Sequence, residues 1–409
     1  MRSVELFGGA GGLALGSEFA GLEGAKFVEW DKWACDTVRQ NRDRGFPLVQ
    51  GWDVHEGDVR AIDWVEFAQS DVIDVVTGGP PCQPFSMAGR ARAADDSRDM
   101  FPAAAEVISA LRPQAFVLEN VRGLTRSAFT NYLQLILLRL KHPDLPARAR
   151  ETWLEHLRRL QQYETSEHSG DAGEYRVVPT LVNAADYGVP QHRHRVFLVG
   201  FRVDIDAEWA FPPATHSHDR LLHDQWVSGD YWERHRVALV KRPELDPRLV
   251  ARVARLSDAD PTTLGRPWRT VRDALVGLPE PTAGGSPGVL NHSLQAGARS
   301  YPGHTGSPLD EPAKTLKAGD HGVPGGENML RRSDGEVRYF TIREAARLQT
   351  FPDTYELHGA WTEAMRQIGN AVPVRLAEVV MASVRERLEA AAVRSELAVD
   401  RALVEALVP

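Results

Sequence analysis

The chain has 409 residues, of which 43% are hydrophobic and 25% charged, and its formal net charge is −8. This length suits two domains, or one large domain that carries a smaller one. No run approaches the roughly 20 apolar residues that a membrane-spanning helix needs. No basic-then-apolar leader precedes Val4–Phe7, which has a typical strand pattern. We therefore expect a soluble globular protein without a membrane segment, which stays in the compartment where it is made.

The two cysteines, Cys35 and Cys82, are too few for a disulfide scaffold or a cysteine-rich zinc site. They favour a reducing cytoplasm, and no metal site is expected. Cys35 lies in a helical pattern and is expected to be a small buried side chain. The negative net charge says little about partners, because basic groups can gather in one cleft. Only six of the 48 basic residues are lysine. Arginine suits bidentate contacts with phosphate and guanine, although a GC-rich genome would explain the same bias.

Short β-rich runs alternate with helical patterns over residues 1–201. The runs with strand character are Val4–Phe7, Lys26–Glu29, Val72–Thr77, Ala115–Glu119, Arg176–Val182 and Arg195–Phe201. The helical patterns between them include Leu13–Ala20, Lys32–Asn41, Pro102–Leu111 and Ala128–Leu140. This alternation predicts an α/β fold with a mostly parallel sheet and helices on both faces. Ligands of such sheets bind at the carboxyl ends of the strands.

The remaining segments suggest further parts of the molecule. Lys141–Glu174 is charged and is expected to be a helical surface insertion. Residues 202–335 are rich in Pro, Gly, His and Arg, and a structureless loop of that length would be implausible in a compact protein. Helical patterns return at Thr341–Gln349 and run from Val374 to about Val393. We predict three parts, namely residues 1–201, a small domain at 202–335, and a C-terminal segment at 336–409.

A glycine-rich turn at Phe7–Leu13 follows the first strand and opens a helix. Glycines allow a tight turn and close approach of the backbone to a ligand. The next strand ends at Glu29, whose carboxylate fits a pair of ribose hydroxyls, and Trp30 could stack on adenine. Asp58 could accept a hydrogen bond from an exocyclic amine. These features fit the adenosine half of either NAD or S-adenosylmethionine and do not separate the two.

A second turn carries the cysteine that the first motif does not explain. Val72–Thr77 runs into Gly78-Gly79-Pro80-Pro81-Cys82-Gln83, where two glycines and two prolines make a rigid turn at the end of a strand. A thiol held on such a turn is expected to be exposed and positioned. Thiolate is a good nucleophile, so Cys82 is a candidate catalytic residue.

Two further motifs lie next to strands. Glu119-Asn120-Val121 ends a β-run, so Glu119 is expected close to Cys82. A carboxyl group beside an apolar strand end has a raised pKa and can donate a proton. In the segment Gln191-His192-Arg193-His194-Arg195, alternation places Gln191, Arg193 and Arg195 on one face. Two guanidinium groups there suit a carbonyl oxygen and a phosphate.

In this order the motifs resemble those of the DNA (cytosine-5)-methyltransferase family, of the bacterial restriction–modification type. The similar segments are Leu6–Gly12, Pro80–Ser86, Glu119–Val121, Gln191–Arg195, Arg343–Pro352 and Gln367–Pro373, which cover most of the chain. Departures are small: Glu5 stands where the family usually has Asp, and Lys141–Glu174 is longer than in the smallest members. The resemblance implies a Rossmann-like, S-adenosylmethionine-dependent methyltransferase sheet, with residues 202–335 as an irregular target-recognition domain.

The resemblance also implies a reaction. A methyl group passes from S-adenosyl-L-methionine to carbon 5 of a flipped-out cytosine in double-stranded DNA, while Cys82 is covalently attached to carbon 6. By similarity, Glu119 hydrogen-bonds ring nitrogen 3, Arg195 with Arg193 holds the carbonyl oxygen, and Asn120 helps to fix the nucleophile loop. The residues expected to bind the cofactor are Phe7, Gly9, Ala10, Gly11, Gly12, Glu29, Trp30, Asp58, Val59, Pro80, Met100, Asn370 and Val372.

Expected DNA contacts come from two regions. Gln83–Asp99 resembles the family's mobile loop that closes over DNA, and its candidate contacts are Gln83, Ser86, Arg90, Arg92 and Arg98. Weaker candidates in the target-recognition domain are Arg299, His304, Lys314, Lys317 and Arg331. The resemblance further implies a monomeric bacterial enzyme in the cytoplasm, associated with the nucleoid through DNA. A cognate restriction endonuclease is a possible companion that the reaction does not require.

Three alternatives remain open at the level of sequence. A tRNA cytosine methyltransferase of the same family is the first, but that branch carries an extra Cys-Phe-Thr, and no cysteine follows Cys82 here. A nucleotide-dependent oxidoreductase would explain the glycine turn and leave Glu119 and Arg195 without a role. A non-catalytic DNA-binding relative would not need an intact Pro81-Cys82 pair.

Overall fold

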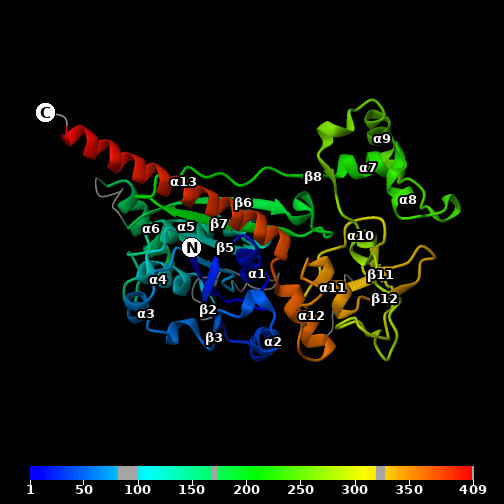
Figure 1. Cartoon of the computed structure of the whole chain (residues 1–409), viewed down its shortest axis with the longest axis horizontal. Helices are drawn as coiled ribbons and strands as arrows, with labels where there is room; N and C mark the ends of the chain where they lie inside the picture. Colours follow the sequence, from blue (N-terminus) through cyan, green and yellow to red (C-terminus); the bar gives the residue numbers. More distant parts are fainter. Residues whose placement is uncertain (82–98, 167–172, 319–327, 408–409) are drawn as a thin grey trace.

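A seven-stranded sheet organises the first half of the chain (Figure 1). This computed structural model describes the backbone of residues 1–81, 99–166, 173–318 and 328–407, and side chains as far as residue 398. The order of strands is β3-β2-β1-β4-β5-β7-β6, and all neighbours are parallel except that β7 runs antiparallel to β5 and β6. The strands are β1 (Arg2–Leu6), β2 (Glu23–Glu29), β3 (Asp53–Glu56), β4 (Val75–Gly78), β5 (Ala115–Val121), β6 (Tyr175–Asn183) and β7 (His194–Arg202). The predicted mostly parallel sheet is confirmed.

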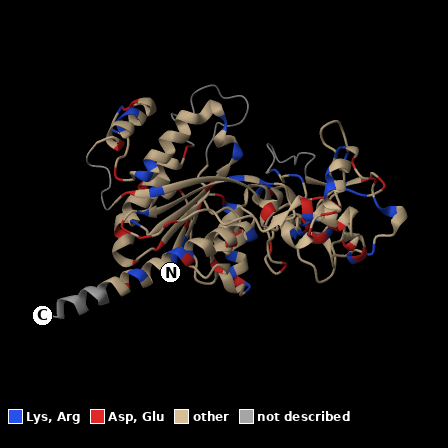
Figure 2. Ribbon diagram, turned by 90° about the horizontal axis from the view of Figure 1, so that it is seen from above, with Lys and Arg blue, Asp and Glu red and all other residues tan. Residues whose placement is uncertain are grey.

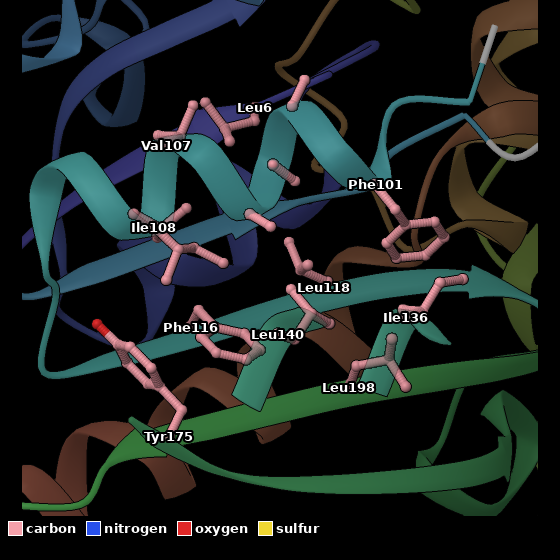
Figure 3. Close-up of a cluster of buried hydrophobic side chains, with 14 of the residues drawn as sticks. Leu6, Phe101, Val107, Ile108, Phe116, Leu118, Ile136, Leu140, Tyr175 and Leu198 are labelled. Atoms are coloured by element: carbon pink, nitrogen blue, oxygen red, sulfur yellow. The ribbon is translucent and has the colours of Figure 1, made fainter. Parts of the chain in front are cut away.

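Helices cover both faces of this sheet. One face packs against α3 (Trp64–Ser70), α4 (Phe101–Leu111), α5 (Thr130–Lys141) and α6 (Trp153–Glu164). Figure 3 shows alternate strand residues such as Phe116, Leu118 and Leu198 pointing into this cluster. The other face, which includes Val117 and Val199, packs against α1 (Gly12–Phe19) and α13 (Val374–Leu407), while α2 (Lys32–Asp43) flanks β2 and β3. Because successive residues of a strand point to opposite faces, the two helix layers sort the sheet's side chains into two apolar cores.

Several elements differ from the sequence prediction. β3 and α3 were not predicted, because β3 is an edge strand with only half-buried or exposed side chains and α3 is only seven residues long. β1 ends at Leu6, since Phe7 adopts a positive φ of 55° that no strand contains. α13 continues to Leu407, well beyond the predicted end near residue 393. The expected helical insertion in 141–174 is present as α6, within the described part of that segment.

The C-terminal helix returns to the first helix of the chain. A Cβ on Gly16 of α1 would lie 2.3 Å from the Cβ of Ala377 in α13, and a Cβ on Gly12 would lie 2.2 Å from the carbonyl oxygen of Val372. Both distances are far shorter than van der Waals contact, so only glycine permits this approach. Leu13 of α1 and Val380 of α13 belong to the same cluster of buried side chains. The first and the last helix of the chain therefore share one apolar core.

Residues 216–318 and 328–340 lie beside the carboxyl ends of the strands (Figure 1). They contain α7 (His218–Trp226), α8 (Asp230–Arg234), α9 (Val250–Leu256) and α10 (Val271–Leu275), with the short strands β8 (His216–Ser217), β9 (Arg266–Pro267), β10 (Ser307–Pro308), β11 (Met329–Arg331) and β12 (Val337–Tyr339). Leu221, Tyr231 and Trp232 form a small separate core. Acidic and basic side chains are interspersed over this region and the sheet region alike (Figure 2). No helix in the described ranges has an apolar stretch long enough to cross a bilayer.

We propose that the three-part division of the chain holds with one adjusted boundary. β11 and β12 form an antiparallel pair that spans residue 335, so a boundary at 335/336 would cut a hairpin. The next segment begins with α11 (Ile342–Leu348), which is followed by α12 (Trp361–Asn370). We therefore place the end of the small domain after Tyr339.

A buried polar cluster of Gln191, Arg193 and Gln349 joins these parts. Arg193 is fully buried, and its terminal nitrogens donate to Leu316 O at 3.0 Å, Gly369 O at 2.7 Å and Ala371 O at 2.9 Å. Gln349 donates to Ile368 O and Ala371 O, and Gln191 donates to the side chain of Gln349 at 3.0 Å. The amide N–H of Leu316 donates back to Gln191. Side chains from the segment before β7 and from the end of α11 thus satisfy backbone groups of the small domain and of the end of α12 at once.

The first prediction concerns this cluster. Arg193→Met retains much of the buried side-chain volume but leaves at least two buried carbonyl groups without a donor. We expect a loss of roughly 2–5 kcal/mol in the free energy of unfolding, measured by urea denaturation.

The matched control is Arg332→Met. Arg332 pairs with Glu280 on the surface, where the two side chains are 37% and 71% exposed. Surface ion pairs contribute about 0–1 kcal/mol, so this variant should be nearly as stable as the native chain. Equal losses in the two variants would contradict a special role for the buried cluster.

Candidate active site

Glu119 and Arg195 form an ion pair at the carboxyl edge of the sheet. Glu119 lies in β5 and Arg195 in β7, and the register that pairs Glu119 with Phe197 places both charged side chains on the same face. Arg195 Nε is 2.5 Å from Glu119 Oε1, and the two side chains are only 10% and 9% exposed. Another nitrogen of Arg195 donates to His194 O. A buried acid and a buried guanidinium are therefore held side by side at this edge.

Burial controls the ionisation of this pair. Loss of hydration raises the pKa of Glu119, and the nearby charges of Arg195 and Arg193 oppose that rise. Burial also lowers the pKa of Arg195, while Glu119 opposes that fall. The Glu119 carboxyl therefore holds a proton more readily than an exposed glutamate does, which suits a hydrogen-bond donor to a ring nitrogen.

The turn after β4 is tied directly to the residue next to Glu119. Asn120 Nδ2 donates to Pro80 O at 2.9 Å, and its Oδ1 accepts from the amide of Val121. The amide of Met100 donates to Pro81 O at 3.2 Å, so the two ends of the segment between them lie together. A Cβ on Gly79 would come within 3.5 Å of Glu119 Oε2. The described start of the turn is therefore rigidly placed beside the Glu119 carboxyl.

The predicted nucleophile itself lies outside the described residues. Cys82 follows Pro81 in the chain, and the candidate DNA contacts Gln83, Ser86, Arg90, Arg92 and Arg98 fall in the same undescribed segment. Their roles stay predictions. Cys35, the other cysteine, is buried in α2 as expected, and burial raises the pKa of its thiol to about 12.

Arg193 has a different environment from the one expected. It was expected to share the base carbonyl with Arg195, but its two terminal nitrogens are already engaged by three backbone carbonyls. Gln191 is likewise fully buried. The alternation of the segment was correctly predicted, but the face carrying these two side chains turns into the protein interior. We therefore no longer assign Arg193 to the base and treat it as a residue that positions the edge.

The glycine-rich turn is closed by Glu29. The amide of Gly9 donates to Glu29 Oε2 at 2.8 Å, and the amides of Trp30 and Asp31 donate to Oε1 at 2.8 and 2.7 Å. Phe7, Gly9 and Gly11 all have positive φ angles. Ala10 is fully buried, and its carbonyl accepts from Tyr355 at 3.0 Å. Glu29 therefore fixes the turn that was expected to hold the cofactor.

The other expected cofactor residues occupy the same edge. Trp30 is 79% exposed directly after β2, whereas Val59 is buried at the start of the short 3-10 helix Val59–Ala61 that follows β3. Asp58 currently forms an exposed ion pair with Arg60, so an amine would have to compete with a guanidinium. Val372 contacts Gly12 through its carbonyl, and Asn370 is exposed at the end of α12.

These features fit an adenosine-bearing cofactor. A Cβ on Gly9 would meet nothing within 4 Å, so the backbone of the turn is open on that side. The exposed indole of Trp30 lies next in sequence to Glu29, which already orients the turn. An aromatic face can stack on an adenine, and an acid can bind the hydroxyls of a ribose. An open glycine turn lets a cofactor come close to the backbone.

Two residues were missed as parts of the site. Glu5 is 5% exposed in the inner strand β1 and contacts the hydroxyl of Thr77. The sequence feature that could have indicated Glu5 is a carboxylate within the otherwise strand-like run Ser3–Leu6. Tyr355, which supports Ala10, follows the similar segment that ends at Pro352 and carried no signal of its own.

The candidate DNA contacts of the small domain are spread over loops and short strands. Arg299 and Arg331 are exposed, and Lys314 donates to Thr305 at 2.9 Å. The His304 ring packs against Tyr301 with centroids 4.3 Å apart. Lys317 lies beside Gly369 through its backbone. The contacts of these side chains with DNA stay predictions.

Comparisons with known proteins agree with the motifs. The model of the C-5 cytosine-specific DNA methylase family matches residues 1–144, 156–259 and 283–386. Type II methyltransferase M.Eco47II of Escherichia coli is 32% identical over 94% of this chain and 79% of its own length. Type II methyltransferase M.PspPI of Psychrobacter sp. (strain TA137) is 30% identical over 95% of this chain and 80% of its own length.

Solved structures support the fold. The S. pombe Dnmt2 methyltransferase matches with a TM-score of 0.56 at 17% identity, over 95% of this chain and 99% of that one. A prophage-encoded protein of E. coli matches with the same TM-score at 21% identity and the same coverage. The ordered motifs, the sheet topology and the family match together lead to one assignment. The chain belongs to the C-5 cytosine-specific DNA methylase family and is a DNA cytosine-5 methyltransferase.

Proposed function

We propose that this protein methylates carbon 5 of a cytosine at a specific site in double-stranded DNA, through a covalent adduct with Cys82. The observation that carries the proposal is the buried Glu119–Arg195 pair beside the turn that Asn120 holds. A proton donor and a guanidinium there match ring nitrogen 3 and the carbonyl oxygen of a cytosine. Cys82 is the next residue of the chain after Pro81, whereas the other cysteine, Cys35, is buried in α2.

The proposed reaction proceeds through a covalent bond between Cys82 and carbon 6 of the base. The Cys82 thiolate adds to carbon 6, and the developing negative charge is stabilised by the hydrogen bond from Glu119 and by Arg195. S-adenosyl-L-methionine, when bound, supplies the methyl group that carbon 5 takes up. Water then removes the carbon-5 proton, and Cys82 leaves as the bond to carbon 6 breaks. The target base must leave the helical stack to reach this edge, at a cost on the order of a few kcal/mol.

The cellular setting is proposed from the relatives. Both compared bacterial relatives are named Type II methyltransferases. We propose that this protein acts as the modification enzyme of a restriction–modification system, as a monomer in the cytoplasm, bound to the nucleoid through DNA. A cognate endonuclease would share its recognition sequence and need not contact it.

Bisulfite sequencing of DNA from cells that express the protein tests the whole proposal. Methylated cytosines at one recurring sequence are expected. Parallel reactions of the purified protein with duplex DNA and with tRNA compare the two substrates. Methyl transfer to tRNA alone would overturn the DNA assignment.

A second prediction concerns Cys82. DNA with 5-fluorocytosine at the target cannot lose its carbon-5 substituent, so the native protein should form a stable adduct visible by denaturing electrophoresis. Cys82→Ala should form none. The control Cys35→Ala removes the other cysteine, which is buried in α2, and should trap DNA as the native protein does. An adduct in Cys82→Ala would show that another nucleophile attacks the base.

A third prediction concerns Trp30. S-adenosylmethionine should quench the fluorescence of this exposed indole, and NAD should not. Trp30→Ala should weaken cofactor binding by about 2–10-fold, the usual contribution of one aromatic contact. Trp33→Phe is the control, because Trp33 lies in α2 against His358 and keeps an aromatic ring. Unchanged affinity in Trp30→Ala would remove Trp30 from the cofactor site.

A fourth prediction concerns Asn120. Asn120→Ala removes the hydrogen bond to Pro80 O and should lower stability by only about 1 kcal/mol. The rate of adduct formation should fall further than the stability, because the nucleophile turn loses its anchor. Stopped-flow trapping at saturating DNA separates the two effects. A normal trapping rate would mean that Asn120 does not position the turn.

A further inference from the structure

Glu5 is a buried acid that the proposed chemistry does not use. It lies in β1, between β2, which ends at Glu29, and β4, which leads to β5 and Glu119. The register pairs Glu5 with Thr77 across β1 and β4, so Glu5 and Thr77 point to the same face. Two residues further along the strands, that face carries Glu119. Three acids therefore follow one another along the carboxyl edge, with Glu5 in the middle.

The hydrogen-bond count around Glu5 favours its neutral form. The Thr77 hydroxyl is 3.3 Å from Val4 O and is also in contact with a Glu5 carboxyl oxygen. It carries one hydrogen and cannot donate to both oxygens at once. A protonated Glu5 supplies the missing hydrogen: Glu5 donates to Thr77, and Thr77 donates to Val4 O. The ionised form would leave one of these buried contacts without a hydrogen.

The charges around Glu5 act in the same direction. Burial raises the pKa of Glu5 to about 8; the Thr77 contact opposes this rise, and the charges of Glu119 and Glu29 add to it. The adjoining run Phe7–Ser17 has no charged residue. Arg193 and Arg195 act on Glu119, and no basic side chain in the described ranges forms an ion pair with Glu5.

We propose that Glu5 is a positioning residue that ionises in place of Glu119. It carries a proton in the free protein and gives it to solvent when a cationic cofactor binds. Its carboxylate then faces the positive sulfonium group and, by repulsion, keeps the proton on Glu119. A cation placed near both acids would otherwise draw the proton from the acid that must donate to the base. This inference rests on the proposed function, because it assumes that Glu119 acts in its protonated form.

The test measures protons as well as activity. Calorimetric titrations in buffers of different ionisation enthalpy give the number of protons released on binding. S-adenosylmethionine should release more protons near pH 7 than S-adenosylhomocysteine, whose sulfur is neutral, with a difference approaching ~1 per site. Glu5→Gln should abolish the difference, and Glu5→Asp, which restores the family's usual residue, should keep it.

A second readout is the pH profile of single-turnover methylation. Without the Glu5 charge, Glu119 loses its proton at lower pH, so the alkaline limb of Glu5→Gln should move to lower pH. At pH 8.5 its rate, relative to its own rate at pH 6.5, should fall on the order of three- to tenfold below that of the native protein. Glu5→Asp should follow the native profile.

The possible results of these measurements distinguish a wrong role for Glu5 from a wrong proposed function. If the native protein binds cofactor and traps 5-fluorocytosine DNA but the two ligands release equal numbers of protons, the role of Glu5 is wrong and the proposed function stands. If no cofactor binds, the proposed function itself fails. The native measurement needs no variant, so it decides the question even if Glu5→Gln does not fold. If folded Glu5→Gln still shows the full difference in proton release between the two ligands, a group other than Glu5 releases the proton.

Discussion

Buried side-chain N–H groups of Gln191, Arg193 and Gln349 donate to backbone carbonyls, and the rest of the structure depends on these hydrogen bonds. The acceptors lie at the end of α11, in the small domain and at the end of α12, which are distant in sequence. A buried carbonyl without a donor is costly, so these segments are held in one arrangement. The same segments place Val372 against Gly12 and leave Asn370 at the edge. The glycine-rich turn and the edge that carries Glu119 and Arg195 are therefore held in a fixed arrangement by the same segments.

Electrostatics at the carboxyl edge follow from this frame. Burial brings Glu5, Glu29 and Glu119 together, and the pKa of each is raised chiefly by loss of hydration. The Glu29 carboxylate accepts hydrogen bonds from three backbone amides, Glu119 pairs with Arg195, and Glu5 contacts a single hydroxyl. These different partners give three chemically identical side chains different proton affinities. In the proposed mechanism, one of these acids fixes a turn, one faces the base and one titrates.

The sequence predicted much of this arrangement, because strong local patterns coincide with it. Apolar runs marked the inner strands, and the glycine and proline turns marked their ends. β3 escaped prediction because an edge strand of mixed polar residues has no apolar run. The spacing in Gln191–Arg195 correctly predicted which side chains share a face, but not that this face turns inward at Arg193. Alternation along one segment does not show which other segment will pack against the face that it defines.

The sequence by itself determined the family, the order of the motifs and the chemical groups available at the edge. It did so because a nucleophile, an acid and a guanidinium at strand ends require particular residues at particular positions. Only the tertiary structure decided which of these groups are free to act. Arg195 remains beside Glu119, whereas Arg193 is used by backbone carbonyls from segments more than 100 residues away. Burial also raises the pKa of Glu5, the residue at which this sequence departs from the family's usual aspartate. Proton affinity depends on desolvation and on neighbouring charges, and a linear pattern contains neither.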